Sequence, residues 1–293
     1  MKFLIIDGYS EKSRENLRKA GMGLACDLYA RMLQAYLPEA EYTVFHPSDQ
    51  GAVFPTRSEL EAFDGIIWTG ADLNINHLHV PSIVAQIDLA KDAYEVGVPS
   101  CGSCWGIQIA AVAAGGTVEP NPRGREMGIG RKIVLTEAGK SHPMMEGKPL
   151  VFDGFESHYD MVVKLPRGAT VLAVNEFTPV QAMAVTHKRG TFWGTQYHPE
   201  YDLHEMASLI VAREEVLTEH GFFADHEEMQ RIVEQMEQLH RRPESKNLRW
   251  QLGVEDDLLS EGIRRREFAN WINNLVIPHA KHTKQNKKEE ENE

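Results

Sequence analysis

The sequence has little cysteine and no long hydrophobic run, and these two absences exclude several classes of protein. Three cysteines in 293 residues are too few for the disulfide framework of a small secreted domain. No apolar run approaches the roughly 18 residues that a membrane-spanning helix needs. Residues 1–7 reach a charged side chain too soon to form a signal peptide. We therefore expect a cytoplasmic protein with reduced thiols and no membrane partner.

Positive charges are outnumbered by negative charges in this chain. Lys and Arg number 31 against 43 Asp and Glu, which leaves a formal net charge of −12. Such a charge repels phosphate backbones, so we expect no nucleic-acid partner. Hydrophobic residues make up 42% and charged residues 25% of the sequence. This balance is typical of globular proteins and excludes a collagen-like or fully disordered chain.

The order of the apolar runs predicts an α/β domain over residues 1–223. In its first half short buried strands alternate with helices, with strands expected at 3–6, 42–45, 65–68 and 98–101 and helices at 22–37, 81–95 and 105–114. Such alternation is typical of a parallel sheet flanked by helices. Five more strands are expected between residues 128 and 197, and a helix over 204–219.

The chain changes character after residue 223. Apolar residues recur at helical spacing amid many charges over 226–241 and 256–276, which predicts a helical C-terminal extension over 224–280. This segment is too hydrophobic for a disordered tail. It either packs on the domain or forms an interface, for example in a homo-oligomer. Residues 281–293 are almost entirely polar, and we expect them to be disordered.

The segment Cys101-Gly-Ser-Cys-Trp-Gly-Ile-Gln108 is the most informative part of the sequence. It lies between a short strand and an apolar helix, and glycines flank Cys104, as in a nucleophile elbow. Glycine permits the strained backbone of such a turn. The N-terminus of the helix favours a thiolate, and the amide of Trp105 can donate to an oxyanion. Cys104 is therefore the candidate nucleophile.

Cys101 and Cys104 also form a Cys-x-x-Cys pair, which permits a redox or a zinc interpretation. A zinc site would need two more ligands, and the third cysteine, Cys26, stands alone in the sequence. A redox pair would not require Gly106 or Gln108. Cys101, inside the predicted strand, is more typical of a small buried hydrophobic residue. The redox pair stays open as the alternative.

A thiol nucleophile needs a base, and the base needs a group that orients it. The segment from Phe192 to Glu200 supplies both, because an apolar strand leads to His198 and Glu200 follows two residues later. Sites in α/β proteins lie at the carboxyl ends of strands, which is where His198 falls. The alternative is a surface His-Pro-Glu turn. We expect His198 to act as the base and Glu200 to orient its imidazole.

These two motifs together carry a family resemblance. Gly-x-Cys104-x-Gly-x-Gln108, followed later by Gln-Tyr-His198-Pro-Glu200, closely resembles the class I (triad) glutamine amidotransferases. The resemblance spans roughly residues 1–223 and is strongest to stand-alone members similar to the amidotransferase domain of GMP synthetase. It implies an α/β fold with a mostly parallel central sheet and flavodoxin-like layering. It also implies a Cys-His-Glu hydrolase that forms a γ-glutamyl thioester and needs no metal or organic cofactor.

Further roles carry over from the family residue by residue. The turn Thr69-Gly70-Ala71 matches the family turn whose glycine amide completes the oxyanion hole, which implies an oxyanion hole made by Gly70 and Trp105. The residues implied to bind glutamine are Gln108, His158, Tyr159 and Asp160. The sequence departs from the family pattern at Thr69, Ala71 and Ser103 and in an insertion over 9–19.

The resemblance implies a glutamine amidotransferase that releases ammonia for a separate acceptor or synthetase partner. Two alternatives stay open. A γ-glutamyl peptide or γ-glutamyl-amine hydrolase would use the same triad with water as the final acceptor. A non-catalytic binding or regulatory module would keep the fold alone, which the intact Cys104, His198 and Glu200 disfavour.

Overall fold

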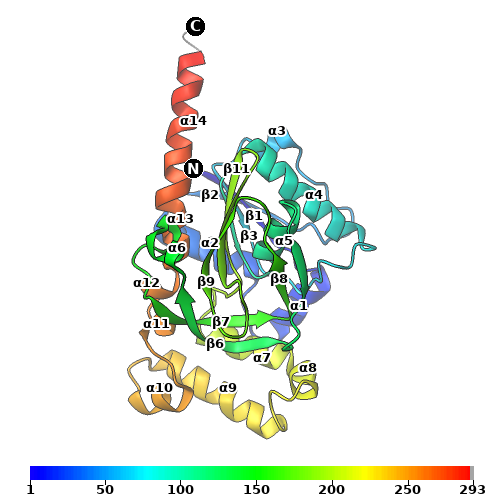
Figure 1. Cartoon of the computed structure of the whole chain (residues 1–293). Helices are drawn as coiled ribbons and strands as arrows, with labels where there is room; N and C mark the ends of the chain where they lie inside the picture. Colours follow the sequence, from blue (N-terminus) through cyan, green and yellow to red (C-terminus); the bar gives the residue numbers. More distant parts are fainter. Residues whose placement is uncertain (291–293) are drawn as a thin grey trace.

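Buried apolar strands form the middle of the molecule, as the sequence predicts. In the computed structural model, which describes residues 1–290, nine strands form one sheet in the order β2-β1-β3-β4-β11-β10-β9-β6-β7 (Figure 1). The first five run parallel: β2 (Glu41–Phe45), β1 (Lys2–Ile6), β3 (Gly65–Trp68), β4 (Ser100–Ser103) and β11 (Gly190–Thr195). Strands β3 and β4 are buried throughout, as parallel strands covered by helices must be. The predicted α/β fold is confirmed.

The remaining strands of the sheet run antiparallel. They are β10 (Ala182–His187), β9 (Ala169–Val174), β6 (Glu126–Leu135) and β7 (Val151–His158). A small separate sheet pairs β5 (Thr117–Pro120) with β8 (Asp160–Lys164). The apolar pattern located most of these strands within a few residues but missed β5 and β7. In β7 a glycine and acidic side chains interrupt the apolar run, because part of this strand carries a polar network.

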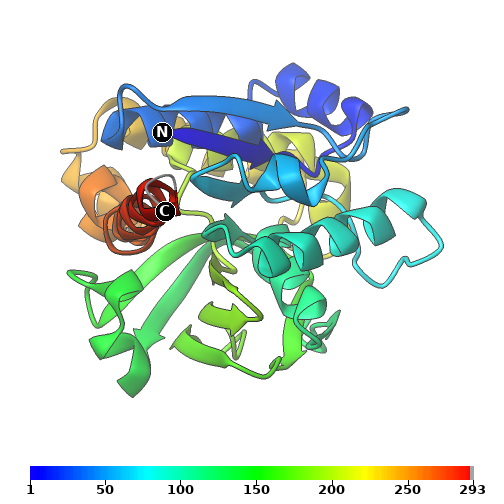
Figure 2. The ribbon, with the colours of Figure 1, turned by 90° about the horizontal axis from the view of Figure 1, so that it is seen from above.

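Helices cover both faces of the parallel half (Figure 2). Side chains of β1 alternate: Phe3 and Ile5 pack with α2 (Ala25–Tyr36), whereas Leu4 and Ile6 pack with α4 (Pro81–Val96) and α5 (Trp105–Ala113). The insertion forms α1 (Glu11–Lys19). The other helices of the domain are α3 (Arg57–Leu60), α6 (Glu137–Ser141), the 3₁₀ turn η1 (Pro143–Met145), α7 (Leu203–Ala212) and α8 (Glu214–Glu219).

The C-terminal extension packs back on the domain. Its first helix, α9 (His226–Arg241), buries Met229, Met236 and Leu239 in a cluster with α7. Further along, α13 (Arg266–Trp271) and the π-helical turn η2 (Ile272–Val276) lie on the α2 side of the sheet, where Trp271 is fully buried. The connecting helices are α10 (Lys246–Leu252), α11 (Asp256–Leu259) and α12 (Glu261–Arg264). The extension is thus part of the hydrophobic core.

The last helix differs from the sequence-based expectation of disorder over 281–293. Helix α14 (Ile277–Glu290) continues from η2 and projects from the body of the molecule (Figure 1), and residues 291–293 lie outside the described residues. Lys, Gln and Glu are good helix formers. High polarity therefore argued against burial of this segment but not against a helix. No helix among the residues described is both long and apolar enough to cross a membrane.

Replacing Trp271 by alanine tests whether the extension belongs to the core. This ring packs against Phe3 and Phe268, so its loss should lower the free energy of unfolding by about 3–5 kcal/mol. Trp250→Ala is the matched control, because that ring is 88% exposed and its loss should cost less than about 0.5 kcal/mol. Urea denaturation followed by circular dichroism measures both. Equal effects would contradict a buried extension.

Candidate active site

Cys104 lies at a sharp turn between β4 and α5. Its backbone angles are φ 51° and ψ −100°, in a region that side chains rarely adopt, and α5 begins at the next residue. The approach to this turn is tight, because a Cβ on Gly102 would come within 2.4 Å of the carbonyl oxygen of Trp68. This is the geometry of a nucleophile elbow.

The imidazole of His198 is held in one orientation. Its Nδ1 lies 2.7 Å from Oε1 of Glu200, and its ring stacks on Tyr201 with 4.1 Å between centroids and 3° between planes. The backbone amide of His198 donates to the carbonyl oxygen of Phe155 at 2.8 Å. Nε2 has no hydrogen-bond partner within the described part of the chain. The carboxylate therefore fixes one ring nitrogen and leaves the other free.

Gly70 lies where Cys104 and His198 approach each other. A Cβ on Gly70 would be 2.8 Å from Cε1 of His198 and 3.6 Å from Cβ of Cys104. The thiol and the imidazole therefore flank the same point, although one follows β4 and the other follows β11. Only glycine leaves room at this contact. The structure thus brings together Gly70, Cys104 and His198, which the sequence predicts to act together.

The surroundings of His198 favour its protonated form. Burial alone lowers its pKa, but the Glu200 carboxylate and the neighbouring Cys104 side chain outweigh this effect and raise the pKa to about 9. At neutral pH the ring is therefore an imidazolium. An imidazolium beside Cys104 holds a proton that can be donated in a reaction.

Ser103 belongs to this group, although the sequence showed it only as a departure from the family pattern. Its hydroxyl donates to Oε1 of Glu200 at 2.9 Å, the same oxygen that faces His198, and Ser103 is fully buried. This hydrogen bond fixes the carboxylate and partly offsets the cost of burying its charge. The contact joins the end of β4 to the turn after β11, so no local motif could have predicted it.

A cavity of about 290 Å³ opens beside Cys104. All four residues implied to bind substrate line it with the cysteine: Gln108, His158, Tyr159 and Asp160. Gln108 donates from Nε2 to the carbonyl oxygen of Asp160 at 3.1 Å. The residues that line the cavity do not include His198, Glu200, Gly70 or Trp105, although Ala71, next to Gly70, does line it.

The cavity also holds two arginines that sequence reasoning missed, Arg125 and Arg213. Arg213 donates to the hydroxyl of Ser157, whose carbonyl oxygen accepts from Sγ of Cys104 at 3.7 Å. No motif marks either arginine: Arg125 lies in the loop before β6, and Arg213 follows the last turn of α7. The cavity therefore places guanidinium groups close to the candidate nucleophile.

Asp160 contributes a carboxylate to the same cavity. Its Oδ1 is buried without a hydrogen-bond partner among residues 1–290. Burial raises the pKa of this carboxyl, although nearby His158 and Arg125 oppose the shift. The cavity is thus lined by a carboxyl group as well as by two guanidinium groups.

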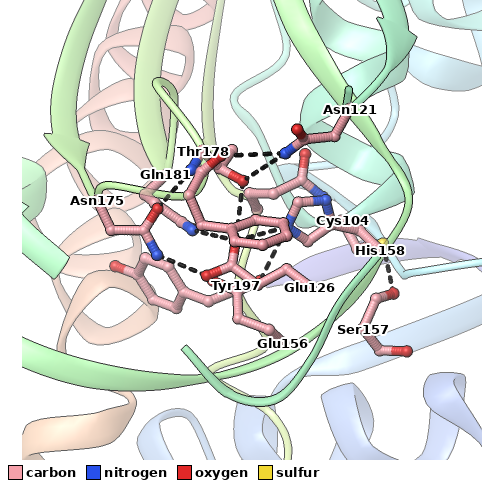
Figure 3. A network of polar contacts seen from close by, with 12 residues as sticks. Cys104, Asn121, Glu126, Glu156, Ser157, His158, Asn175, Thr178, Gln181 and Tyr197 are labelled. Carbon is pink, nitrogen blue, oxygen red and sulfur yellow. Dashed lines mark hydrogen bonds and ion pairs between the residues drawn. The ribbon is translucent and has the colours of Figure 1, made fainter. Parts of the chain in front are cut away.

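A buried network holds His158 at the wall of the cavity (Figure 3). Nε2 of His158 lies 3.2 Å from Glu126. Glu126 also accepts hydrogen bonds from three other side chains, those of Asn175, Thr178 and Gln181. These contacts fix the orientation of the imidazole.

Glu126, Glu156 and His158 also form a donor set that could ligate a metal, with ligand atoms within 4.8 Å of one another. The oxygens of Glu126, however, already face amide and hydroxyl hydrogens, which would repel a cation. Burial and the charge of Glu126 raise the pKa of Glu156 well above its usual value, which favours the neutral form of this carboxyl. The residues present therefore fit a hydrogen-bonded support for His158 better than a metal site.

Residues 27–216 match the family model named Glutamine amidotransferase class-I. The chain belongs to this family. The resemblance inferred from the two motifs is thereby confirmed, and the matched range contains Cys104, His198 and Glu200.

Two curated relatives resemble this family member to different extents. The γ-glutamyl-L-1-hydroxyisopropylamide hydrolase of a Pseudomonas species is 34% identical over 286 residues, which cover 96% of this chain and 95% of the relative. The GMP synthase of Nitrosomonas eutropha is 36% identical over 179 residues, which cover 59% of this chain and 32% of the synthase. The matched part of the chain thus spans about a third of the length of that synthase.

Solved structures share the fold of this family member. A glutamine amidotransferase from Thermotoga maritima has a TM-score of 0.67 at 16% identity, covering 94% of this chain and 98% of that one. A glutamine amidotransferase from Methylobacillus flagellatus has a TM-score of 0.64 at 20% identity, covering 92% and 93%. At these low identities the structural similarity shows only that the fold is shared.

Glu200→Gln should lower the pKa of His198, because the carboxylate is the group that most strongly opposes the effect of burial. Loss of one adjacent charge shifts a pKa by about 1–3 units. NMR titration of the imidazole measures the shift, with His198→Asn to assign the signal and the exposed Glu244→Gln as the control. If the ring titrates near 6.5 in the unchanged protein, the assigned charge pairing is wrong.

Proposed function

We propose that this protein hydrolyses the amide bond of γ-glutamyl compounds through a γ-glutamyl thioester on Cys104. The observation that carries the proposal is the approach of Cys104 and a Glu200-bound His198 to one point beside a charged cavity. A cysteine and a histidine with an orienting carboxylate are the groups that acyl transfer requires. Membership of the class-I glutamine amidotransferase family supports an amidohydrolase.

In the proposed reaction the Cys104 thiolate attacks the γ-carbonyl carbon, and the carbonyl oxygen becomes an oxyanion. The amides of Gly70 and Trp105 donate to this oxyanion, an effect worth roughly 3–4 kcal/mol per donor in comparable sites. Trp105 is the first residue of α5, so its amide has no acceptor within the helix. The strained turn at Cys104 aims the sulfur and the helix end at the same point.

His198 moves the protons of the reaction. Its imidazolium gives a proton to the leaving nitrogen as the carbon–nitrogen bond breaks, which leaves a thioester and releases ammonia or an amine. The neutral ring then takes a proton from water as the water attacks the thioester, and glutamate leaves. Glu200 holds the ring throughout. These steps use the chain's own groups and water alone.

The charges in the cavity complement the α-amino and α-carboxylate groups of a γ-glutamyl compound. Arg125 and Arg213 supply guanidinium groups, which bind carboxylates through paired hydrogen bonds. The unpartnered oxygen of Asp160 is suited to an ammonium group. Gln108, His158 and Tyr159 complete the wall on the Asp160 side.

The two candidate reactions differ in the fate of the released nitrogen, because water attacks the thioester in both. The Pseudomonas hydrolase resembles this chain over nearly the whole length of both, whereas the likeness to the Nitrosomonas synthase covers 32% of that protein. We therefore place hydrolysis of the γ-glutamyl amides of small amines first. Hydrolysis of glutamine, with ammonia passed to a synthetase, is the second candidate, and the likeness to GMP synthases supports it.

A substrate screen with the purified protein tests the proposal. Glutamine, γ-glutamyl peptides and γ-glutamyl alkylamides are compared, and released glutamate, ammonia and amine are measured separately. A kcat/KM for an alkylamide at least about tenfold above that for glutamine supports the first candidate. The opposite preference, with turnover that rises when a synthetase is added, supports the second. If nothing is turned over and a glutamine analogue does not alkylate Cys104, both are rejected in favour of a binding module.

Cys104→Ala should abolish turnover, whereas Cys101→Ala should keep most of it. Cys104 lines the cavity, but Cys101 faces the hydrophobic cluster around α2. Burial also raises the pKa of Cys101 well above its usual value, which makes its thiolate inaccessible at neutral pH. Steady-state assays of both variants measure the difference. Equal losses would restore the redox-pair interpretation.

Arg213→Leu should raise KM for a γ-glutamyl amide roughly 10–100-fold, the loss expected for one charged hydrogen bond, while kcat changes much less. The matched control is Arg241→Leu, which removes a 71% exposed arginine of α9. Initial rates over a wide range of substrate concentration separate the two constants. An unchanged KM would show that Arg213 does not hold the substrate.

A further inference from the structure

The C-terminal extension is bound to the residue immediately before His198. Oε1 of Glu267, in α13, accepts a hydrogen bond from the hydroxyl of Tyr197 and lies 2.7 Å from Nζ of Lys148. The side chains of Glu267 and Lys148 are 3% and 2% exposed, and Tyr197 is also buried. A buried ion pair gains little stability over well-packed apolar residues. Stability alone therefore does not account for this group.

Lys148 joins the extension to the sheet. Its ammonium group donates to the carbonyl oxygens of Ile263 and Arg264 at 3.1 and 3.4 Å. It also lies 4.4 Å from the ring centre of Phe152 on β7. Glu267 cannot move away without leaving this buried charge unpaired, which costs several kcal/mol. The acceptor for Tyr197 is therefore held firmly in place.

Tyr197 in turn fixes the backbone from which His198 projects. Its side chain belongs to the hydrophobic cluster shared by α2 and the extension, while its carbonyl oxygen accepts from the hydroxyl of Thr195 at 2.8 Å. Tyr197 directly precedes His198, so anchoring its side chain and its carbonyl oxygen limits how far the backbone at His198 can move.

The extension also reaches the turn that carries the orienting carboxylate. Glu267 and Trp271 of the extension line a small cavity of about 20 Å³ together with Gly102 and Pro199. Pro199 lies between His198 and Glu200, and Gly102 precedes the turn of Cys104. The family match ends at residue 216, so Glu267 and Trp271 lie outside the matched region.

We propose that Glu267 is a positioning residue of the active site, and that the extension acts through the Tyr197 hydroxyl to hold His198 where it can react. This inference rests on the proposed function, because it takes His198 as the acid–base group. On this inference the extension contributes to catalysis as well as to the hydrophobic core.

A double-mutant cycle of Tyr197→Phe and Glu267→Leu tests the inference, because the first change removes the donor and the second removes the acceptor of the same hydrogen bond. Each single change should lower kcat about tenfold with KM within about twofold, because a small displacement of a catalytic group lowers the rate of the chemical step. The double variant should lose no more than Glu267→Leu alone, because the hydrogen bond is already absent from that variant. Rates are divided by the concentration of active sites titrated with an alkylating glutamine analogue, so that unfolded protein does not count.

Leu258→Ala is the matched control, because Leu258 is buried in the extension but packs in a different cluster. It should lower Tm without changing the normalised kcat. Tyr197→Phe keeps the ring and the Glu267–Lys148 pair, so it tests the inference by itself if Glu267→Leu fails to fold. An unchanged kcat in Tyr197→Phe, with the unchanged protein active, overturns this inference alone. An unchanged protein that neither turns over substrate nor is alkylated rejects the proposed function and this inference with it.

Discussion

The parallel pairing of β4 with β11 is the constraint on which the candidate site depends. In this pairing Ser103 lies opposite Thr195, so the two strands end at the same level and deliver Cys104 and His198 to one edge of the sheet. The two turns can approach so closely because Gly70, from the neighbouring strand's turn, has no side chain. A shift of the register would separate the thiol from the imidazole even if every other contact survived.

Burial determines how the charges of the site behave. The imidazole of His198 is charged at neutral pH because a carboxylate is enclosed with it, and the enclosed carboxylate is held in turn by Ser103. The cavity side differs, since Asp160 keeps one oxygen without a partner among the residues described. One face of the site thus holds the hydrogen-bonded group of His198, Glu200 and Ser103, while the other carries Asp160 and the two arginines of the cavity. On our proposal the first face performs the proton transfers and the second selects the γ-glutamyl group.

The sequence predicted the parts of this arrangement that depend on local pattern. Buried runs such as 65–68 specify strands wherever they occur, and glycines around Cys104 permit one kind of turn. Contacts made by tertiary packing could not be predicted from the sequence. No local motif marks Arg213, Ser103 or Glu267, because their partners lie on other elements. Helix α14 was not predicted either, because the polarity of its residues reports on burial and not on whether they form a helix.

The central claim, a thioester on Cys104, can be tested by trapping the intermediate. The protein is mixed with a γ-glutamyl alkylamide, quenched in acid within the first turnovers, digested and analysed by mass spectrometry. The account predicts a γ-glutamyl group on the peptide that contains Cys104, attached to that sulfur and released by hydroxylamine. Turnover of the substrate with the γ-glutamyl group on another residue, or with no covalent adduct under conditions where hydrolysis of a thioester is slow, would contradict it.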